Sequence, residues 1–277
     1  MSINTPLKFF LIKIINCSLK NNSQYGLDTY KNSLDFLPVR QIKEKFNKLF
    51  SYENKYSLSL VLFNGEKLSL NIQKGILNKS LRNMIQMTSF QRSIIIGIIL
   101  SDGWMQHRIR WNPKIGFKQS IKNFEYFWYV FIQLSSLCSN YPWLTKTIKR
   151  GKLFYALEFQ TRQLRCIIEI YTLFYYESKI KVIKPELYDY LDYLALAHWI
   201  MGDGAKKNKG LTLCTDNFSY KEVVLLMNIL KIKYDINTTM HKEKNKPRIY
   251  INDKELLKIL PYIKPYFTKN FLYKIHL

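Results

Sequence analysis

The chain has few cysteines, few acids and no long apolar run, and each shortage excludes a class of protein. Its four cysteines form no CxxC pair, and none of its four histidines lies at zinc-ligand spacing from them. Neither a disulfide scaffold nor a structural zinc is therefore indicated. The longest apolar run, from Ile94 to Leu100, is far shorter than the roughly 20 residues that span a bilayer, so no membrane partner is expected. The first 27 residues lack arginine and a small-residue cleavage pattern, so no targeting segment is expected either.

Acidic residues are outnumbered two to one by basic residues. The 277 residues include 43 Lys plus Arg and 20 Asp plus Glu, which gives a formal net charge of +23. The excess is spread along the chain, and a hydrophobic share of 47% supports a large buried core. Because such an excess causes self-repulsion, a nucleic-acid partner is favoured over a generic basic soluble protein.

Residues 1–85 differ from the rest of the chain. Period-two alternation in residues 56–63 and 66–72 flanks the dipeptide Asn64-Gly65, which suits a type I′ turn. This pattern predicts a β-hairpin in an N-terminal extension whose role the sequence does not reveal.

A first structural unit is expected over residues 86–180. Thr88 and Gln91 form a capping box before an apolar helix that ends at Ser101. Alternation then predicts a strand from Trp104 to Trp111 and a second strand after Asn112-Pro113. An aromatic-rich helix, a hairpin with Gly151 at its tip and another helix complete the unit.

The same order recurs over residues 181–277. A helix ends at Gly204, and basic strands follow at about residues 206–214. A capping box then opens a helix at Ser219, and a last hairpin precedes a helix near Asp253. The predicted fold class is therefore α+β, with helix, two strands, helix, two strands and helix occurring twice. Such a duplication makes one chain behave as a pseudo-symmetric dimer, so a monomer is expected.

Two Asp-Gly dipeptides mark equivalent points of the repeats, 101 positions apart, at Asp102 and Asp203. An acid in the last turn of a helix faces the negative end of the helix dipole, which is unfavourable. A divalent cation shared by the two acids would reverse that cost, and carboxylate oxygens suit Mg²⁺. Ser101 and Gly202, which precede the acids, are assigned to the same metal site.

Small residues on both motif helices predict that the helices pack closely. Gly97 and Ser101 lie four positions apart on the first helix, and Gly202 lies at the end of the second. Gly103 and Gly204 are interpreted as left-handed caps that end the helices.

The segments Ile95–Gly103 and Leu196–Gly204 resemble the two copies of the LAGLIDADG motif. About residues 90–277 resemble the monomeric mitochondrial branch of the LAGLIDADG homing endonucleases, while residues 1–85 lie outside the resemblance. The resemblance implies a saddle of two four-stranded antiparallel sheets that straddles double-stranded DNA in the major groove.

The resemblance also implies an activity and a cofactor. Mg²⁺ or Mn²⁺ held by Asp102 and Asp203 would support one cut in each strand of a long asymmetric site, promoting intron mobility. Lysines near the cleavage sites match Lys181 and Lys274, although a solvated or phosphate-contacting lysine is as good a reading of each. His198, a lone imidazole on an apolar helix, is expected to be a packing residue.

Sequence recognition is expected on the polar strand faces. Arginine, lysine and glutamine there would reach base edges or phosphates, whereas the alternative is a solvated sheet face. The residues assigned to DNA binding are Gln106, Arg108, Arg110, Lys118, Lys242 and Arg248.

Two other functions stay open. An RNA-binding intron maturase with the same fold would use the same charge to bind intron RNA, and a bifunctional protein is compatible with both acids being present. A DNA-binding regulator with LAGLIDADG-like architecture would need a helix-turn-helix domain, which residues 1–85 do not suggest. Richness in Lys, Asn, Ile, Tyr and Phe, typical of AT-rich codons, points with the resemblance to a mitochondrial gene, with a plastid as second choice.

Overall fold

The structure, a computed structural model, describes residues 60–61, 67–68, 77–149, 151–175, 180–243 and 245–277. The chain divides into Met1–Leu58 and Ser59–Leu277, and only the second unit is described below. Strands β1 (Leu60–Val61) and β2 (Lys67–Leu68) pair antiparallel, as the predicted hairpin requires. The Asn64-Gly65 turn lies outside the described residues. Helix α4 (Lys79–Met84) follows.

The first repeat contains the predicted order of elements. It comprises α5 (Ser89–Leu100), β3 (Trp104–Gln106), β4 (Lys114–Ser120), η1 (Ile121–Asn123), α6 (Phe124–Leu134), η2 (Ser135–Leu137), β5 (Trp143–Lys149), β6 (Lys152–Gln160), η3 (Arg165–Ile167) and α7 (Ile168–Tyr175). The capping box of Thr88 and Gln91 is present at the start of α5. Gly151, at the tip between β5 and β6, has a φ of 72°, a conformation that favours glycine.

The second repeat follows the same order. It comprises α8 (Leu187–Tyr190), α9 (Tyr193–Asp203), β7 (Gly204–Lys207), β8 (Gly210–Leu213), α10 (Tyr220–Tyr234), β9 (Thr238–Glu243), β10 (Lys246–Ile251), α11 (Asp253–Ile263), η4 (Lys264–Tyr266) and η5 (Lys269–Ile275). The predicted capping box of Ser219 and Glu222 opens α10. Among the described residues, no helix is both long and apolar enough to cross a bilayer.

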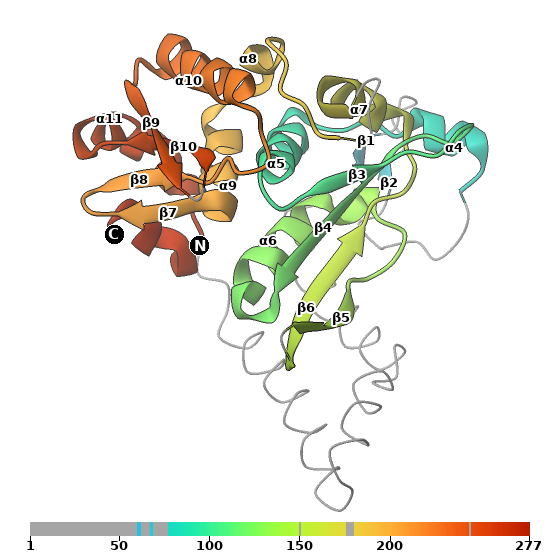
Figure 1. The fold of residues 1–277 in the computed structure, drawn as a ribbon. Coiled ribbons are helices and arrows are strands. Elements are labelled where there is room, and N and C mark those ends of the chain that lie inside the picture. Colours follow the sequence, from blue (N-terminus) through green and yellow to red (C-terminus); the bar gives the residue numbers. More distant parts are fainter. Residues whose placement is uncertain (1–59, 62–66, 69–76, 150, 176–179, 244) are drawn as a thin grey trace, which may run out of the picture. The chain divides into compact units, whose positions relative to one another are not determined.

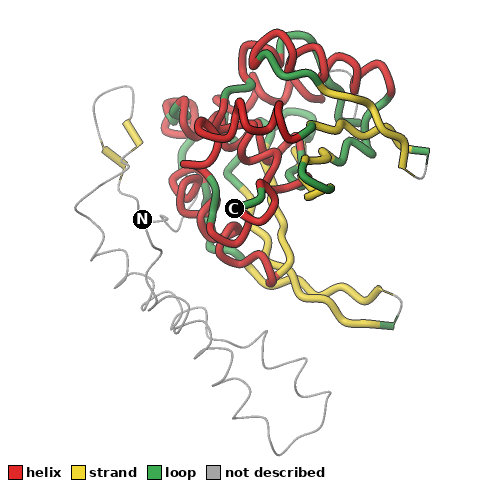
Figure 2. Tube along the Cα trace, turned by 90° about the vertical axis from the view of Figure 1, so that its left-hand side faces the viewer, coloured by secondary structure: helices red, strands yellow, loops and turns green. Residues whose placement is uncertain are grey.

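Two four-stranded antiparallel sheets, one in each repeat, confirm the predicted fold class. Their strand orders are β3-β4-β6-β5 and β7-β8-β10-β9, so the same topology is used twice. Helices α5 and α9 lie between the two sheets (Figure 1). In Figure 2 the helices gather on one side and the strands of both sheets on the other. Each sheet therefore has one face covered by helices and one face that the described helices leave uncovered.

Period-two alternation assigns side chains to the two faces of the first sheet. Ile115 and Phe117 of β4 and Phe159 of β6 have no exposed surface. The ring of Phe117 stacks on that of Phe127 of α6 at 5.9 Å between centroids. Burying such large rings stabilises the fold by roughly 2–3 kcal/mol each. The residues between them point to the uncovered face.

The predicted strand from Trp104 to Trp111 is wrong beyond Gln106. Ladder pairing ends where Gln106 meets Lys114. The chain then turns, with the Trp111 amide donating to the Arg108 carbonyl at 3.0 Å, and Arg110 has a φ of 68°. Residues after Gln106 have no partner strand opposite them, so alternation in the sequence did not become a strand.

The motif helices α5 and α9 approach closely at small residues, as predicted. A Cβ atom built on Gly97 would lie 2.4 Å from the Ala195 carbonyl oxygen, and one on Gly202 would lie 2.2 Å from Ser101 Oγ. Any side chain at either position would collide with the other helix. At their opposite ends, Ser93 of α5 donates to Asp192, the N-cap residue of α9. The pair is thus fixed at both ends.

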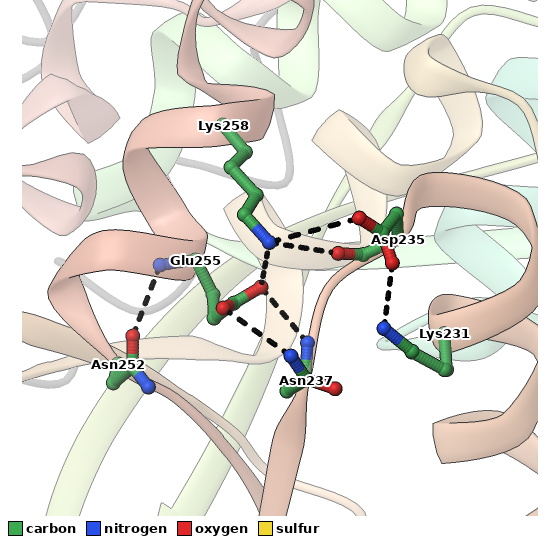
Figure 3. Close-up of polar contacts among 6 residues, drawn as sticks. All are labelled: Lys231, Asp235, Asn237, Asn252, Glu255 and Lys258. Atoms are coloured by element: carbon green, nitrogen blue, oxygen red, sulfur yellow. Dashed lines mark hydrogen bonds and ion pairs between the residues drawn. The ribbon is translucent and has the colours of Figure 1, made fainter.

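A polar cluster joins α10 to α11 on the helix side of the second repeat (Figure 3). The Glu255 carboxylate is buried and accepts the Asn237 backbone amide at 2.9 Å and Lys258 Nζ at 2.8 Å. Lys258 and Lys231 both pair with Asp235, which ends α10 with a φ of 52°. These contacts fix the start of β9, and they lie on the helix side of the second sheet and not on its uncovered face.

Candidate active site and nucleic-acid interface

The two acids lie at the ends of the two motif helices. Asp102 follows the last residue of α5 by two positions and is exposed, whereas Asp203 is the last residue of α9 and is half-buried. Because α5 and α9 pack together at Gly202, the acids converge. The position of a Cβ on Gly202 lies 3.7 Å from Asp102 Oδ2.

The prediction that Gly103 and Gly204 are left-handed caps is wrong. Gly204 has φ −72° and ψ 139°, and Gly151 is the single glycine with positive φ in the described ranges. A Cβ on Gly103 would lie 2.8 Å from the Ile98 carbonyl oxygen, and one on Gly204 would lie 2.4 Å from that of Ile200. Glycine is required because the backbone at the start of each strand passes so close to a carbonyl of the last helical turn that a Cβ atom would collide with it.

The acids influence each other through space. Burial raises the pKa of Asp203 from 3.8 to about 7, and the charge of Asp102 adds to this effect. The ammonium groups of Lys181 and Lys274 act in the opposite direction. Burial and the charge of Asp102 thus disfavour the ionised form of Asp203, a cost that a cation bound at the site would offset.

Lys181 and Lys274 occupy equivalent positions in the two halves of the site. Lys181 Nζ donates to the carbonyl oxygens of Ile99, Ser101 and Gly103 at the end of α5. Lys274 Nζ donates to those of Ile200, Met201 and Gly202 at the end of α9, the Met201 contact being 2.6 Å. Each ammonium therefore satisfies carbonyls that the helix end leaves without partners.

Burial lowers the pKa of both lysines to about 8, although Asp102 and Asp203 raise it. Each ammonium group thus interacts electrostatically with both carboxylates. The four side chains that the sequence suggested for catalysis are brought together at one place.

Gln119 belongs to this site and was missed by the sequence reasoning. Its buried side-chain amide donates to Asp102 Oδ2, and its Oε1 accepts from Asn123 Nδ2 at 2.9 Å. The amide orientation is fixed by Asn123, so Gln119 holds the Asp102 carboxylate in place. The signal in the sequence was weak, because Gln119 lies in a strand whose alternation predicts only which face it occupies.

Tyr126 of α6 and His198 of α9 are buried near the acids, and the charge of Asp102 adds to burial in raising the pKa of Tyr126. The Tyr126 hydroxyl lies 3.0 Å from His198 Nδ1, and both side chains are fully buried. Burial lowers the pKa of His198 to about 3, so its imidazole is neutral. His198 Nε2 has no hydrogen-bond partner within the described ranges. These features agree with a packing role for His198 at the helix interface.

The donor set suits a hard divalent cation only in part. Within the described ranges no three His, Cys, Asp or Glu side chains converge at metal-binding distance. Asp102 and Asp203 supply carboxylate oxygens, the ligands that Mg²⁺ and Mn²⁺ prefer. The carbonyls of Ser101 and Gly202 face the site but already accept from Lys181 and Lys274. Remaining ligands would have to be water or phosphate oxygens, which is usual for Mg²⁺.

The uncovered face of the first sheet is polar and basic. Gln106 pairs with Lys114 across β3 and β4, and Lys118 pairs with Glu158 across β4 and β6. Because Met105 and Phe117 are buried on the helix side, Gln106 and Lys118 point to the uncovered face. Arg108 and Arg110 are exposed in the loop between β3 and β4 instead of in a strand.

On the second sheet, Arg248 and Lys242 lie on opposite faces. Pro247 and Ile249 are buried on the helix side, so Arg248 between them points to the uncovered face. Lys242 pairs with Pro247 across the ladder, and its ammonium lies 5.6 Å from the centre of the Tyr220 ring of α10. Lys242, which was assigned to DNA binding together with Arg248, therefore lies on the helix side of the sheet, opposite the face that carries Arg248. The reason is the register, which shifts Lys242 by one residue onto the helix side.

The chain is thus a duplicated α+β unit with paired acids between two sheets, each of which leaves one polar face uncovered. The sequence profile of the LAGLIDADG DNA endonuclease family matches residues 92–259, more than half of the chain. The protein belongs to the LAGLIDADG DNA endonuclease family.

Similar proteins include both maturases and endonucleases. The chain is 34% identical over 236 residues to the cytochrome b mRNA maturase bI2 of Saccharomyces cerevisiae, covering 80% of this chain and 53% of that protein. It is 35% identical over 126 residues to the intron-encoded endonuclease ai4 of Dictyostelium discoideum, covering 45% of this chain and 79% of that protein. The chain thus spans about half the length of the maturase that it matches.

A solved structure supports the fold. The homing endonuclease I-WcaI bound to its DNA recognition sequence matches with a TM-score of 0.64 at 28% sequence identity, covering 69% of this chain and 87% of that chain.

Proposed function

We propose that the protein is a site-specific double-strand DNA endonuclease that acts as a monomer on a long asymmetric site. The single observation that carries this proposal is the convergence of Asp102 and Asp203 between two sheets with polar, uncovered faces. The similar fold of the homing endonuclease I-WcaI, which was solved bound to its DNA recognition sequence, supports the proposal. The proposal includes intron mobility and a mitochondrial gene, and relatives named as a cytochrome b mRNA maturase and an intron-encoded endonuclease support it.

Asp102 and Asp203 would hold Mg²⁺ or Mn²⁺, with Ser101 and Gly202 as neighbouring backbone positions. Bound there, the cation would lower the pKa of the attacking water and neutralise charge on the phosphate. Lys181 and Lys274 keep positive charge beside the two acids and hold the helix ends that carry them. Gln119 orients the Asp102 carboxylate.

DNA recognition is assigned to the uncovered sheet faces. Gln106, Lys118 and Arg248 point there, and Arg108 and Arg110 extend from the loop beside the first sheet. Exposed basic groups supply phosphate affinity that falls with salt, whereas strand residues reach base edges in the major groove. Lys242 no longer belongs to this set, because its ammonium lies against Tyr220.

The test is cleavage of the intron-lacking form of the host gene in the presence of Mg²⁺. We expect a double-strand break with the wild-type protein and its loss in EDTA. Intact DNA with folded wild-type protein, or cleavage undiminished by both Asp102→Asn and Asp203→Asn, would refute the endonuclease.

A maturase function is the second candidate, and the name of the bI2 relative favours it. It would use the same basic protein to bind intron RNA and assist splicing. Splicing support that survives Asp102→Asn and Asp203→Asn, measured with the unspliced host transcript, would establish this role separately from cleavage.

A further inference from the structure

Arg248 is the only arginine on the described strands, and its guanidinium is held by two carboxylates. Its Nε and Nη2 atoms donate to Asp216 Oδ1 and Oδ2, both at 2.8 Å, and its Nη1 donates to Glu243 Oε2. Asp216 follows β8, Arg248 lies on β10, and Glu243 ends β9, so three parts of the second repeat meet here. The guanidinium therefore has a fixed plane and direction on the uncovered face.

This arrangement is poorly suited to binding phosphate. Phosphate affinity comes from cations that exchange a counterion for the backbone. Here Asp216 and Glu243, two of the protein's 20 acids, both contact one arginine, so the positive charge of Arg248 is already opposed by two carboxylates. Acids on a face that approaches DNA repel the phosphates, and a protein with 43 basic residues does not need Arg248 for charge. The carboxylates must serve another purpose.

The remaining hydrogen-bonding groups match one base pair. A guanidinium has five N–H donors, and three of those on Arg248 are used, which leaves two. Glu243 is half-exposed and carries a second carboxylate oxygen. In the major groove, guanine presents two acceptors, N7 and O6, and its cytosine partner presents a donor at N4. Two donors beside one acceptor are the complement of that edge.

We propose that Arg248 and Glu243 together read one G·C pair of the DNA site, and that Asp216 is a positioning residue that fixes the Arg248 guanidinium. The inference rests on the proposed function, because it requires a DNA duplex against the uncovered face. Asp216 occupies the Nε–Nη2 edge of the Arg248 guanidinium. The N–H donors that remain for a base are therefore already oriented in the protein without DNA. That preorganisation favours guanine over bases with other acceptor patterns.

The experiment is selection of bound duplexes from a library of randomised double-stranded DNA, followed by sequencing. Binding is measured in Ca²⁺ with the Asp102→Asn, Asp203→Asn double variant, so the result does not depend on cleavage. The tested variants add Arg248→Lys, Glu243→Gln or Asp216→Asn. Lys207→Ala serves as control, because Lys207 is an exposed residue that the ladder places on the same face of the second sheet.

We expect one position of the selected site to be G·C, with preference falling on the order of 10- to 100-fold in Arg248→Lys and less in Asp216→Asn and Glu243→Gln. Other positions should keep their preferences. Lys207→Ala should weaken all sequences alike. Unchanged preferences in Arg248→Lys, with a lower melting temperature in Asp216→Asn, would show that the cluster only ties strands together and would overturn the inference. If the parent protein enriches no sequence, DNA recognition itself fails, and the inference fails with it.

Discussion

At the end of α5, Asp102 is exposed and accepts a hydrogen bond from Gln119, whereas Asp203 at the end of α9 is half-buried and receives none from the described side chains. The ladder pairs Trp104 with Gly116 and Ala205 with Thr212, so Thr215 occupies the position equivalent to Gln119. The Thr215 hydroxyl instead donates to the Pro247 carbonyl at 2.6 Å, within the second sheet.

The two repeats therefore share a scaffold but not a site. Both helix ends are held by a lysine, and both strands leave across a glycine. The groups beside the acids differ, because Gln119 contacts the Asp102 carboxylate in one repeat, whereas the equivalent Thr215 contacts the Pro247 carbonyl in the other. Duplication preserved the backbone requirements, while the contacts of the two carboxylates diverged.

The largest expected effect comes from removing one acid at a time. If each acid serves one strand, Asp102→Asn and Asp203→Asn should each slow one cut on the order of 1000-fold and leave the other. A supercoiled plasmid carrying the target would then accumulate in nicked form. Asp253→Asn, which alters an exposed acid on α11, should behave as wild type. Loss of both cuts in either single variant would show that the acids act as one unit.

A smaller effect is expected from disturbing what the repeats share. Gly202→Ala places a methyl group 2.2 Å from Ser101 Oγ, so the motif helices must separate. We expect the free energy of unfolding to fall by about 3 kcal/mol, the upper end for overpacking. Urea denaturation followed by circular dichroism measures this change. Val224→Ala, on the exposed face of α10, is the control and should cost under about 0.5 kcal/mol.

Gln119→Ala and Thr215→Ala separate the roles of two equivalent positions. Gln119→Ala should slow the cut that depends on Asp102 by about 10- to 100-fold, because the carboxylate loses its fixed orientation. Thr215→Ala should leave both cuts unchanged and lower stability by about 1–3 kcal/mol, because the Pro247 carbonyl loses its donor. Strand-resolved cleavage rates and denaturation curves test both statements. Equal slowing of both strands by Gln119→Ala would contradict the asymmetry.

The smallest effect is a pH dependence of stability without metal. Burial raises the pKa of Asp203 from 3.8 to about 7. Its contribution to stability is fully present below pH 4 and is lost as the pH rises through 7. In EDTA, Asp203→Asn should therefore raise the melting temperature at pH 8 and change it little at pH 4. An increase in melting temperature that is the same at both pH values would show that the protein does not disfavour the ionised form of Asp203.

Much of the fold could be predicted because it depends on local patterns. Both capping boxes, the hairpin turn at Gly151 and the repeated order of elements follow from spacing within a few residues. Failures occurred where a distant partner decides the outcome. The strand after Trp104 ended at Gln106 because no strand lies opposite the following residues.

The candidate site was predictable in its acids and lysines but not in their contacts. Asp102 and Asp203 were identified because an acid at a helix C-terminus conflicts with the helix dipole, a conflict visible in the sequence. Gln119 was missed because its role depends on a tertiary contact, the hydrogen bond that its side-chain amide donates to Asp102. Lys242 was assigned to a DNA-binding strand face but lies on the helix side, because one residue of register moves a side chain to the other side of a sheet.

The sequence alone determined the duplication, the helix ends and the pair of acids, since each depends on residue types at short or repeated spacing. Only the tertiary structure decided that Asp102 has an amide partner and Asp203 does not, that both lysines hold helix carbonyls, and that Arg248 lies between two carboxylates. These contacts join residues separated by up to 82 positions. Burial and distance set their strength, and neither can be read from the order of residues along a chain.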